Sequence, residues 1–167
     1  MQWEQITNVI LISSIATVAV FILLGLYQWI SRKSIKKVDA EIRWMPLPLL
    51  LMTIVYYLFD KVWIVATRPN GSGEPAFPST HVMVVTTIFF IVTIVIPKYI
   101  KSVAIQIILE FIMVILISLT CTGRIMSNMH SLWDVLGAIV FAFIFSEIYY
   151  IIIRKGKKNA KRLHQNH

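Results

Sequence analysis

Long apolar runs separated by short polar segments dominate this chain. Five runs approach or exceed the roughly 20 mostly apolar residues that a helix needs to cross a bilayer, and they cover approximately residues 8–30, 46–67, 80–96, 101–120 and 131–153. Runs that are apolar all round show no sharp polar face, as is typical of helices surrounded by lipid. The pattern therefore predicts an all-α integral membrane helical bundle of about five transmembrane helices, with residues 1–167 as a single domain.

The composition supports a membrane environment. Hydrophobic residues make up 57% of the 167 residues and charged residues only 14%, and the mean hydropathy is +0.75; a soluble domain is typically 45–50% apolar. The first apolar run is longer than a signal-peptide core and has no basic segment before it, so it is interpreted as a retained span. A single cysteine, Cys121, excludes an internal disulfide framework and a cysteine metal cluster.

The basic residues are distributed unevenly between the two sides of the predicted bundle. The net charge is +8, and 13 of the 16 Lys and Arg residues fall on the side that receives residues 31–44, 97–101 and the tail 154–167. Cytoplasmic segments collect Lys and Arg, so we expect a multi-pass plasma-membrane protein with a basic cytoplasmic tail and no nucleic-acid partner. The remaining three, Lys61, Arg68 and Arg124, lie on the outer side, where an anionic ligand would explain them.

The first of three outward motifs ends the second run. Lys61 and Arg68 are seven residues apart, which would place them on one helical face roughly 10 Å apart along the axis, and Pro69 would end the helix. A lysine inside the membrane boundary usually lines a polar cavity. The alternative is a lysine that reaches for the interface and pairs with its neighbour Asp60.

The second motif opens the third run. The turn-rich segment 70–77 leads to Pro78, Ser79, Thr80 and His81, an order typical of a helix N-terminus. Free backbone N–H groups and the helix dipole favour an anion there. The alternative is a plain helix cap with a histidine at the interface.

The third motif lies between the fourth and fifth runs, from Gly123 and Arg124 to His130 and Asp134. His130 and Asp134 are four residues apart and would share a helical face. An aspartate that accepts a hydrogen bond from one imidazole nitrogen leaves the other free as a nucleophile or base. The alternative is a surface His–Asp pair.

These motifs would meet on one side of the membrane, although they are far apart in sequence. Two histidines beside several cations are suited to phosphoryl transfer through a phosphohistidine. Few carboxylates accompany them, so we expect no magnesium or zinc site.

The three motifs resemble the signature of the type 2 phosphatidic acid phosphatase (PAP2) superfamily, which reads KxxxxxxRP, PSGH and SRxxxxxHxxxD. The first is complete from Lys61 to Pro69; Thr80 replaces the usual Gly in the second, and Gly123 replaces the usual Ser in the third. Family members commonly have six spans, so five implies the absence of one, expected at the N-terminal end.

The resemblance implies a metal-independent phosphatase without a cofactor. His130 would attack phosphorus, Asp134 would orient His130, and His81 would protonate the leaving oxygen and then activate water. The phosphate oxygens would be held by Lys61, Arg68, Ser79, Thr80 and Arg124.

The expected substrate is a lipid phosphate at the outer membrane face, such as undecaprenyl diphosphate, phosphatidylglycerophosphate or phosphatidate. Three alternatives compete with this interpretation. A vanadate-dependent haloperoxidase shares the signature, but those enzymes are soluble. A non-catalytic lipid-binding or scaffold protein could retain the pocket. A transporter would use a carboxyl inside a span, such as Glu110 or Glu147, although a neutral buried carboxyl explains both residues more simply.

Overall fold

The protein is a bundle of long helices in a computed structural model that describes residues 2–32 and 39–165. In these two ranges the elements, in chain order, are α1 (Gln2–Arg32), α2 (Ala40–Arg43), α3 (Pro46–Tyr57), the π-helix η2 (Leu58–Val62), α4 (Thr80–Tyr99), α5 (Val103–Met126) and α6 (Leu132–Gln165). Five helical segments are long and apolar enough to cross a membrane, with Ala40–Val62 counted as one. The prediction of an all-α membrane bundle is confirmed, and the chain is a multi-pass membrane protein.

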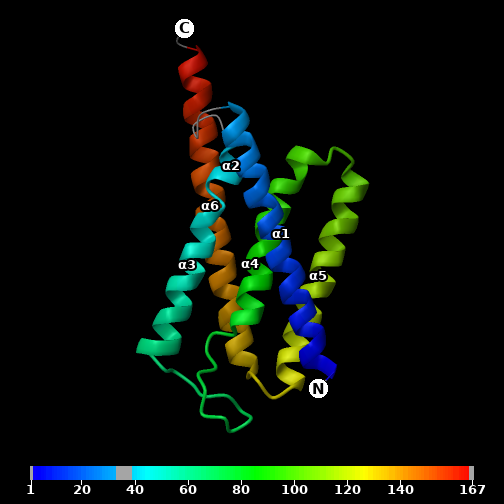
Figure 1. Ribbon diagram of the computed structural model, residues 1–167, viewed down its shortest axis with the longest axis vertical. Helices are drawn as coiled ribbons and strands as arrows, with labels where there is room; N and C mark the ends of the chain where they lie inside the picture. Colours follow the sequence, from blue (N-terminus) through cyan, green and yellow to red (C-terminus); the bar gives the residue numbers. More distant parts are fainter. Residues whose placement is uncertain (1, 33–38, 166–167) are drawn as a thin grey trace.

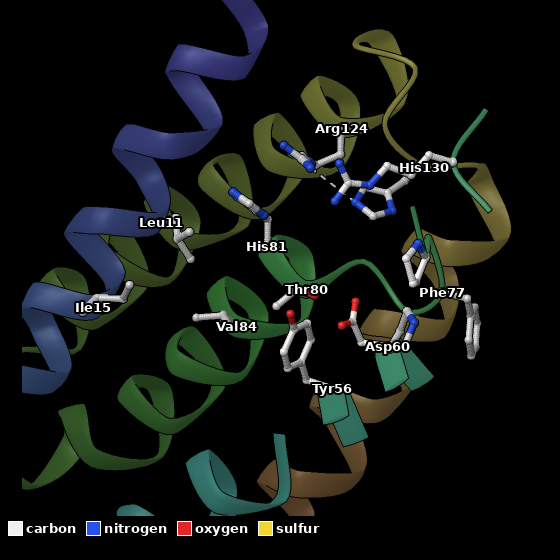
Figure 2. Close-up of a pocket in the computed structure, with 13 residues that line it drawn as sticks. Leu11, Ile15, Tyr56, Asp60, Phe77, Thr80, His81, Val84, Arg124 and His130 are labelled. Atoms are coloured by element: carbon white, nitrogen blue, oxygen red, sulfur yellow. Dashed lines mark hydrogen bonds between the residues drawn. The ribbon is translucent and has the colours of Figure 1, made fainter. Parts of the chain in front are cut away.

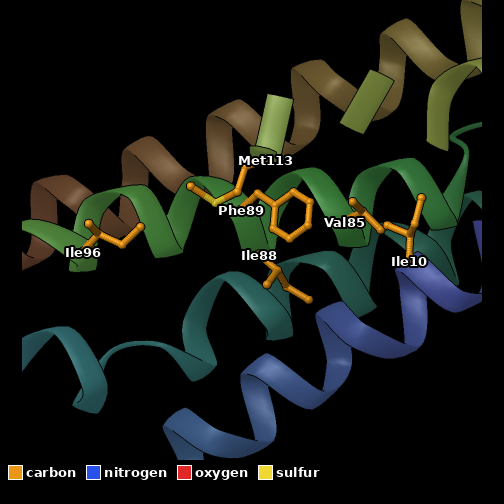
Figure 3. Close-up of a cluster of buried hydrophobic side chains, with 6 residues drawn as sticks. All are labelled: Ile10, Val85, Ile88, Phe89, Ile96 and Met113. Atoms are coloured by element: carbon orange, nitrogen blue, oxygen red, sulfur yellow. The ribbon is translucent and has the colours of Figure 1, made fainter. Parts of the chain in front are cut away.

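Helix α4 is the centre of the bundle and packs on α1, α3, α5 and α6 (Figure 1). A cluster of apolar side chains from three helices shows how it is surrounded: Ile10 of α1, Met113 of α5 and four residues of α4, namely Val85, Ile88, Phe89 and Ile96 (Figure 3). The outer faces of α1 and α5 carry many exposed apolar side chains, among them Ile12, Leu23, Ile107 and Phe111. Such faces are suited to contact with lipid.

The two ends of the bundle carry different polar groups. The N-terminus, the connection 63–79 and the turn 127–131 lie at one end, and the C-terminal part of α6 lies at the other (Figure 1). At the far end Lys98 Nζ lies 3.0 Å from carboxylate oxygens of both Asp39 and Glu41, and the Tyr149 hydroxyl donates to the Glu41 carbonyl. These contacts join α2 to α4 and α6, well away from the predicted site.

The second apolar run departs from its prediction. A helix was expected through residue 67, but it ends at Val62. The last turn is π-helical, and in it the Trp63 N–H donates to the Leu58 carbonyl at 2.7 Å. The next residues pair with the returning chain instead: Ala76 N–H donates to the Ala66 carbonyl at 2.9 Å. The run 62–67 is rich in β-branched residues, which are weak helix formers, so backbone hydrogen bonds to the returning segment replace the helix there.

Two further boundaries differ from expectation. Helix α5 continues to Met126, so Gly123 and Arg124 are helical and not part of a loop. Helix α6 continues to Gln165, so the backbone of the predicted tail is helical. Of the basic residues expected on the cytoplasmic side, Lys33, Lys36 and Lys37 lie outside the described residues.

Candidate active site

A cavity of about 410 Å³ opens at the end of the bundle that carries the N-terminus (Figure 2). Its polar lining comes from three separate parts of the chain: Arg68 from the connection 63–79, His81 from α4, and Arg124 and His130 from the end of α5 and the turn after it. Thr80 and Asp60 add oxygens, and Leu11, Ile15 and Val84 form an apolar wall. The predicted convergence of the outward motifs is therefore present for five of the predicted residues.

Local backbone structure places His130 in the cavity. After α5 ends, Asn128 adopts φ 54, a left-handed conformation that asparagine tolerates better than most residues. The chain then reverses, and the His130 N–H donates to the Arg124 carbonyl at 3.2 Å. The side chain is 5% exposed, and its Nδ1 donates to the Ala76 carbonyl at 2.8 Å.

The environment of His130 keeps its imidazole neutral. Burial, followed by the positive charge of Arg124, lowers the pKa of His130 to about 4. Because Nδ1 carries the proton that bonds the Ala76 carbonyl, Nε2 carries the lone pair. Nε2 lies 3.4 Å from Nη2 of Arg124, beside the cavity, so its lone pair accepts a hydrogen bond from that guanidinium.

Asp134 has a different role from the one expected. Its Oδ2 accepts hydrogen bonds from the Ser131 N–H at 2.6 Å and from the Ser131 hydroxyl at 2.9 Å, while the Asp134 N–H donates back to that hydroxyl at 3.3 Å. This reciprocal pattern is a capping box at the start of α6. The predicted hydrogen bond from His130 to Asp134 is therefore replaced: a backbone carbonyl holds Nδ1, and the carboxylate caps the helix.

The Ala76 carbonyl is fixed because the next residue is clamped. The Phe77 ring lies so close to Gly137 of α6 that a Cβ there would come within 2.3 Å of it. The ring also makes an edge contact with Phe59 at a centroid distance of 5.3 Å. The neighbouring Ser79 N–H donates to the Asp134 carbonyl at 3.1 Å. The connection and the start of α6 therefore hold each other in register.

Arg68 approaches the cavity on a short hairpin. Its N–H donates to the Glu74 carbonyl at 2.9 Å, and Gly71 and Gly73 supply the positive φ values that reverse the chain. The guanidinium forms an ion pair with Glu74, whose side chain is more exposed than that of Arg68. An incoming anion would have to compete with this carboxylate.

Several buried polar atoms around the cavity have no hydrogen-bond partner within the described chain. They include Nε of Arg68, Nε of Arg124 and Oγ of Ser79. A buried polar group without a partner costs roughly 1–3 kcal/mol. Arg68 and Arg124 line the cavity, and Ser79 lies between the lining residues Pro78 and Thr80, so a ligand rich in acceptors would lower this cost if the side chains moved to meet it. A tetrahedral oxyanion has suitable acceptors.

Lys61 is placed differently from the prediction. Because the helix ends early, Lys61 and Arg68 do not share a helical face. The Lys61 ammonium forms an ion pair of 2.7 Å with Asp60 and its side chain is 63% exposed, whereas Asp60 lines the cavity and Lys61 does not. The alternative pairing with Asp60 is what the structure contains.

Sequence reasoning missed the contribution of the first helix. Asn8 Oδ1 lies 3.0 Å from Nε2 of His81, and Leu11 and Ile15 line the cavity one and two turns further along. The sequence carried one signal: Asn8 is an amide at the edge of an apolar run, and polar residues in such runs usually face a partner. Nothing in the spacing indicated that the partner would be His81.

Comparison with known proteins bears on the chain from η2 onward. A protein-family model described as the PAP2 superfamily matches residues 58–158, more than half of the chain. No curated protein and no solved structure matches it significantly. The matched segment includes Arg68, His81, Arg124 and His130 but not α1.

Proposed function

From the premise that this chain belongs to the PAP2 superfamily, a family of phosphatase-type hydrolases, we propose that it hydrolyses a lipid phosphate or diphosphate through a phosphohistidine at His130. The observation that carries this proposal is the meeting of two imidazoles and two guanidinium groups in one cavity with an apolar wall. The guanidinium groups would bind phosphate oxygens, and the apolar wall would accept the lipid chain.

In the first step Nε2 of neutral His130 attacks phosphorus in line with the bond to the lipid oxygen. The new P–N bond forms as that P–O bond breaks, and His81 gives its proton to the leaving oxygen. Arg68 and Arg124 stabilise the negative charge on the equatorial oxygens, and the backbone N–H groups at the start of α4, beside Ser79 and Thr80, would add donors.

In the second step His81, now neutral, takes a proton from water as the water oxygen attacks the phosphohistidine. The P–N bond breaks and its electron pair returns to Nε2, which releases inorganic phosphate. Asp134 supports both steps indirectly, because its capping box fixes the turn that carries His130. Lys61 would contribute only if it left Asp60.

Undecaprenyl diphosphate, phosphatidylglycerophosphate and phosphatidate are the proposed substrates, since each joins a phosphate to apolar chains. We also propose that the cavity opens on the side of the plasma membrane that faces away from the cytoplasm. The support is the uneven distribution of Lys and Arg along the sequence: 13 of the 16 fall in segments predicted to lie on the opposite side of the membrane. A reporter fused after Lys158 should then be cytoplasmic, and an external signal would reverse the orientation.

The decisive experiment measures phosphate release from these three lipids by the purified protein in detergent, with His130→Ala as the control. We expect release by the wild type, none above background by His130→Ala, no inhibition by a chelator, and inhibition by vanadate. Wild-type release without a labile phosphohistidine, or strict magnesium dependence, would refute the mechanism. Lipid phosphate binding with no release would favour the non-catalytic lipid-binding alternative, to which the replacements at Thr80 and Gly123 give some support.

A further inference from the structure

The first helix, outside the segment that matches the family, reaches the candidate general acid–base. Asn8 Oδ1 lies 3.0 Å from Nε2 of His81, a contact between α1 and α4 across 73 positions of sequence. We propose that Asn8 is a positioning residue for His81: its amide oxygen holds the proton on Nε2 and so reserves Nδ1 for proton transfer. This inference rests on the proposed function, because it assigns His81 its acid–base role.

Packing on both sides of Asn8 fixes its position. Thr7 is fully buried and lies against Gly123 of α5, where an added Cβ would come within 2.6 Å of Thr7 Cγ2. Ile10 is 6% exposed and belongs to the apolar cluster built on α4 (Figure 3). Small residues allow such close approach between membrane helices. The neighbours of Asn8 in sequence thus hold α1 in the register that the contact with His81 needs.

An amide oxygen is suited to this role because it accepts a hydrogen bond without carrying charge. In neutral His81 it favours the tautomer with the proton on Nε2, which leaves the lone pair on Nδ1. When Nδ1 also takes a proton, a carboxylate partner would strongly stabilise the imidazolium, whereas the amide does so weakly. His81 can therefore give up the Nδ1 proton to a leaving group and take one from water.

A purely structural explanation is that Asn8 only satisfies its own amide at the rim of the bundle. Changing the acceptor distinguishes the two explanations, because only a positioning role connects the acceptor to the chemistry of His81. Asn8→Asp keeps the size of the side chain and adds charge, and Asn8→Ala removes the acceptor. Ser13→Ala is a matched control, since Ser13 lies on the same helix and is exposed, and its hydroxyl donates to the Ile10 carbonyl of its own helix at 2.8 Å.

The test measures kcat, KM and their pH dependence for phosphate release from the best lipid substrate. For Asn8→Ala we expect kcat to fall about fivefold to tenfold with KM little changed, the size of one lost hydrogen bond. For Asn8→Asp the pH profile of kcat should change, because a carboxylate stabilises the His81 imidazolium more strongly than an amide does. Ser13→Ala should match the wild type. Wild-type kcat in Asn8→Ala, or an unchanged pH profile in Asn8→Asp, would overturn the inference.

A spectroscopic measurement separates failure of this inference from failure of the proposed function. The ¹⁵N shifts of His81, assigned by the signals that disappear in His81→Gln, report the tautomer whether or not any lipid is hydrolysed. We expect protonated Nε2 and unprotonated Nδ1 in the wild type and a mixture in Asn8→Ala. The same tautomer in both proteins would refute the role of Asn8, even in an active enzyme. An inactive wild type with the expected shifts would refute only the phosphatase.

Discussion

Gly123 offers a test in which the sign of the effect carries the information. It lies inside α5, where replacing glycine by alanine normally stabilises a helix by about 0.5–1 kcal/mol. Here the added Cβ would come within 2.6 Å of Thr7 Cγ2. Overpacking of this kind costs about 1–3 kcal/mol, so we expect Gly123→Ala to be destabilising by about 1–2 kcal/mol despite the better helix propensity.

Thr7→Ser provides the matched rescue. It removes the Cγ2 methyl and keeps the hydroxyl that donates to the Glu4 carbonyl at 3.0 Å. In the Thr7→Ser background the clash is absent, so Gly123→Ala should become neutral or stabilising by up to about 1 kcal/mol. The coupling between the two sites should therefore be about 1–3 kcal/mol.

The assay is reversible unfolding in mixed micelles, with the free energy compared across the four members of the cycle. Gly156→Ala is the control, because Gly156 is helical in α6 and a Cβ there has no neighbour within 4 Å; it should show only the gain in helix propensity. A Gly123→Ala protein at least as stable as the wild type, or one equally destabilised with Thr7→Ser, would show that α1 does not pack on α5 as described.

Three further predictions concern the cavity. Burial lowers the pKa of His130 to about 4. After correction for substrate ionisation, kcat/KM should therefore not fall through protonation of His130 between pH 5 and 7, and it should fall as the pH drops through 4. An acid limb near pH 6.5 would contradict this. Lys61→Ala should reduce kcat/KM far less than Arg124→Ala, since Lys61 pairs with Asp60 and does not itself line the cavity; equal losses in steady-state kinetics would place Lys61 on the phosphate. Glu74→Gln should lower KM by about twofold to fivefold, the value of a partly exposed ion pair, and an unchanged KM would mean that this pair does not compete with substrate.

Most of the helical architecture could be predicted because bilayer thickness imposes it. A stretch of about 20 apolar residues has few alternatives to a spanning helix, since lipid offers no partner for free backbone groups. The motifs likewise predicted that Arg68, His81, Arg124 and His130 would come together, and all four line one cavity. The end of the second helix was predicted less well, because the competing hydrogen bonds come from residues 74–76, six to ten positions further along the chain than their partners.

The partners of the site residues required the tertiary structure. The spacing of His130 and Asp134 favoured a hydrogen bond between them. In the structure the Asp134 carboxylate instead caps α6 by accepting from the Ser131 N–H, and the imidazole of His130 donates to the Ala76 carbonyl. Gly123 looked like a lost serine in the sequence, whereas in the fold it is the point where Thr7 approaches α5.

The sequence by itself determined that this chain belongs in a membrane, how its helices follow one another, and which residue types could handle phosphate. Tertiary structure alone decided that α1 belongs to the site, through Asn8, Leu11 and Ile15. The physical reason is one of range: hydrophobicity and helix formation act between near neighbours in the chain, while a hydrogen bond or a close contact between helices depends on how separate helices pack together.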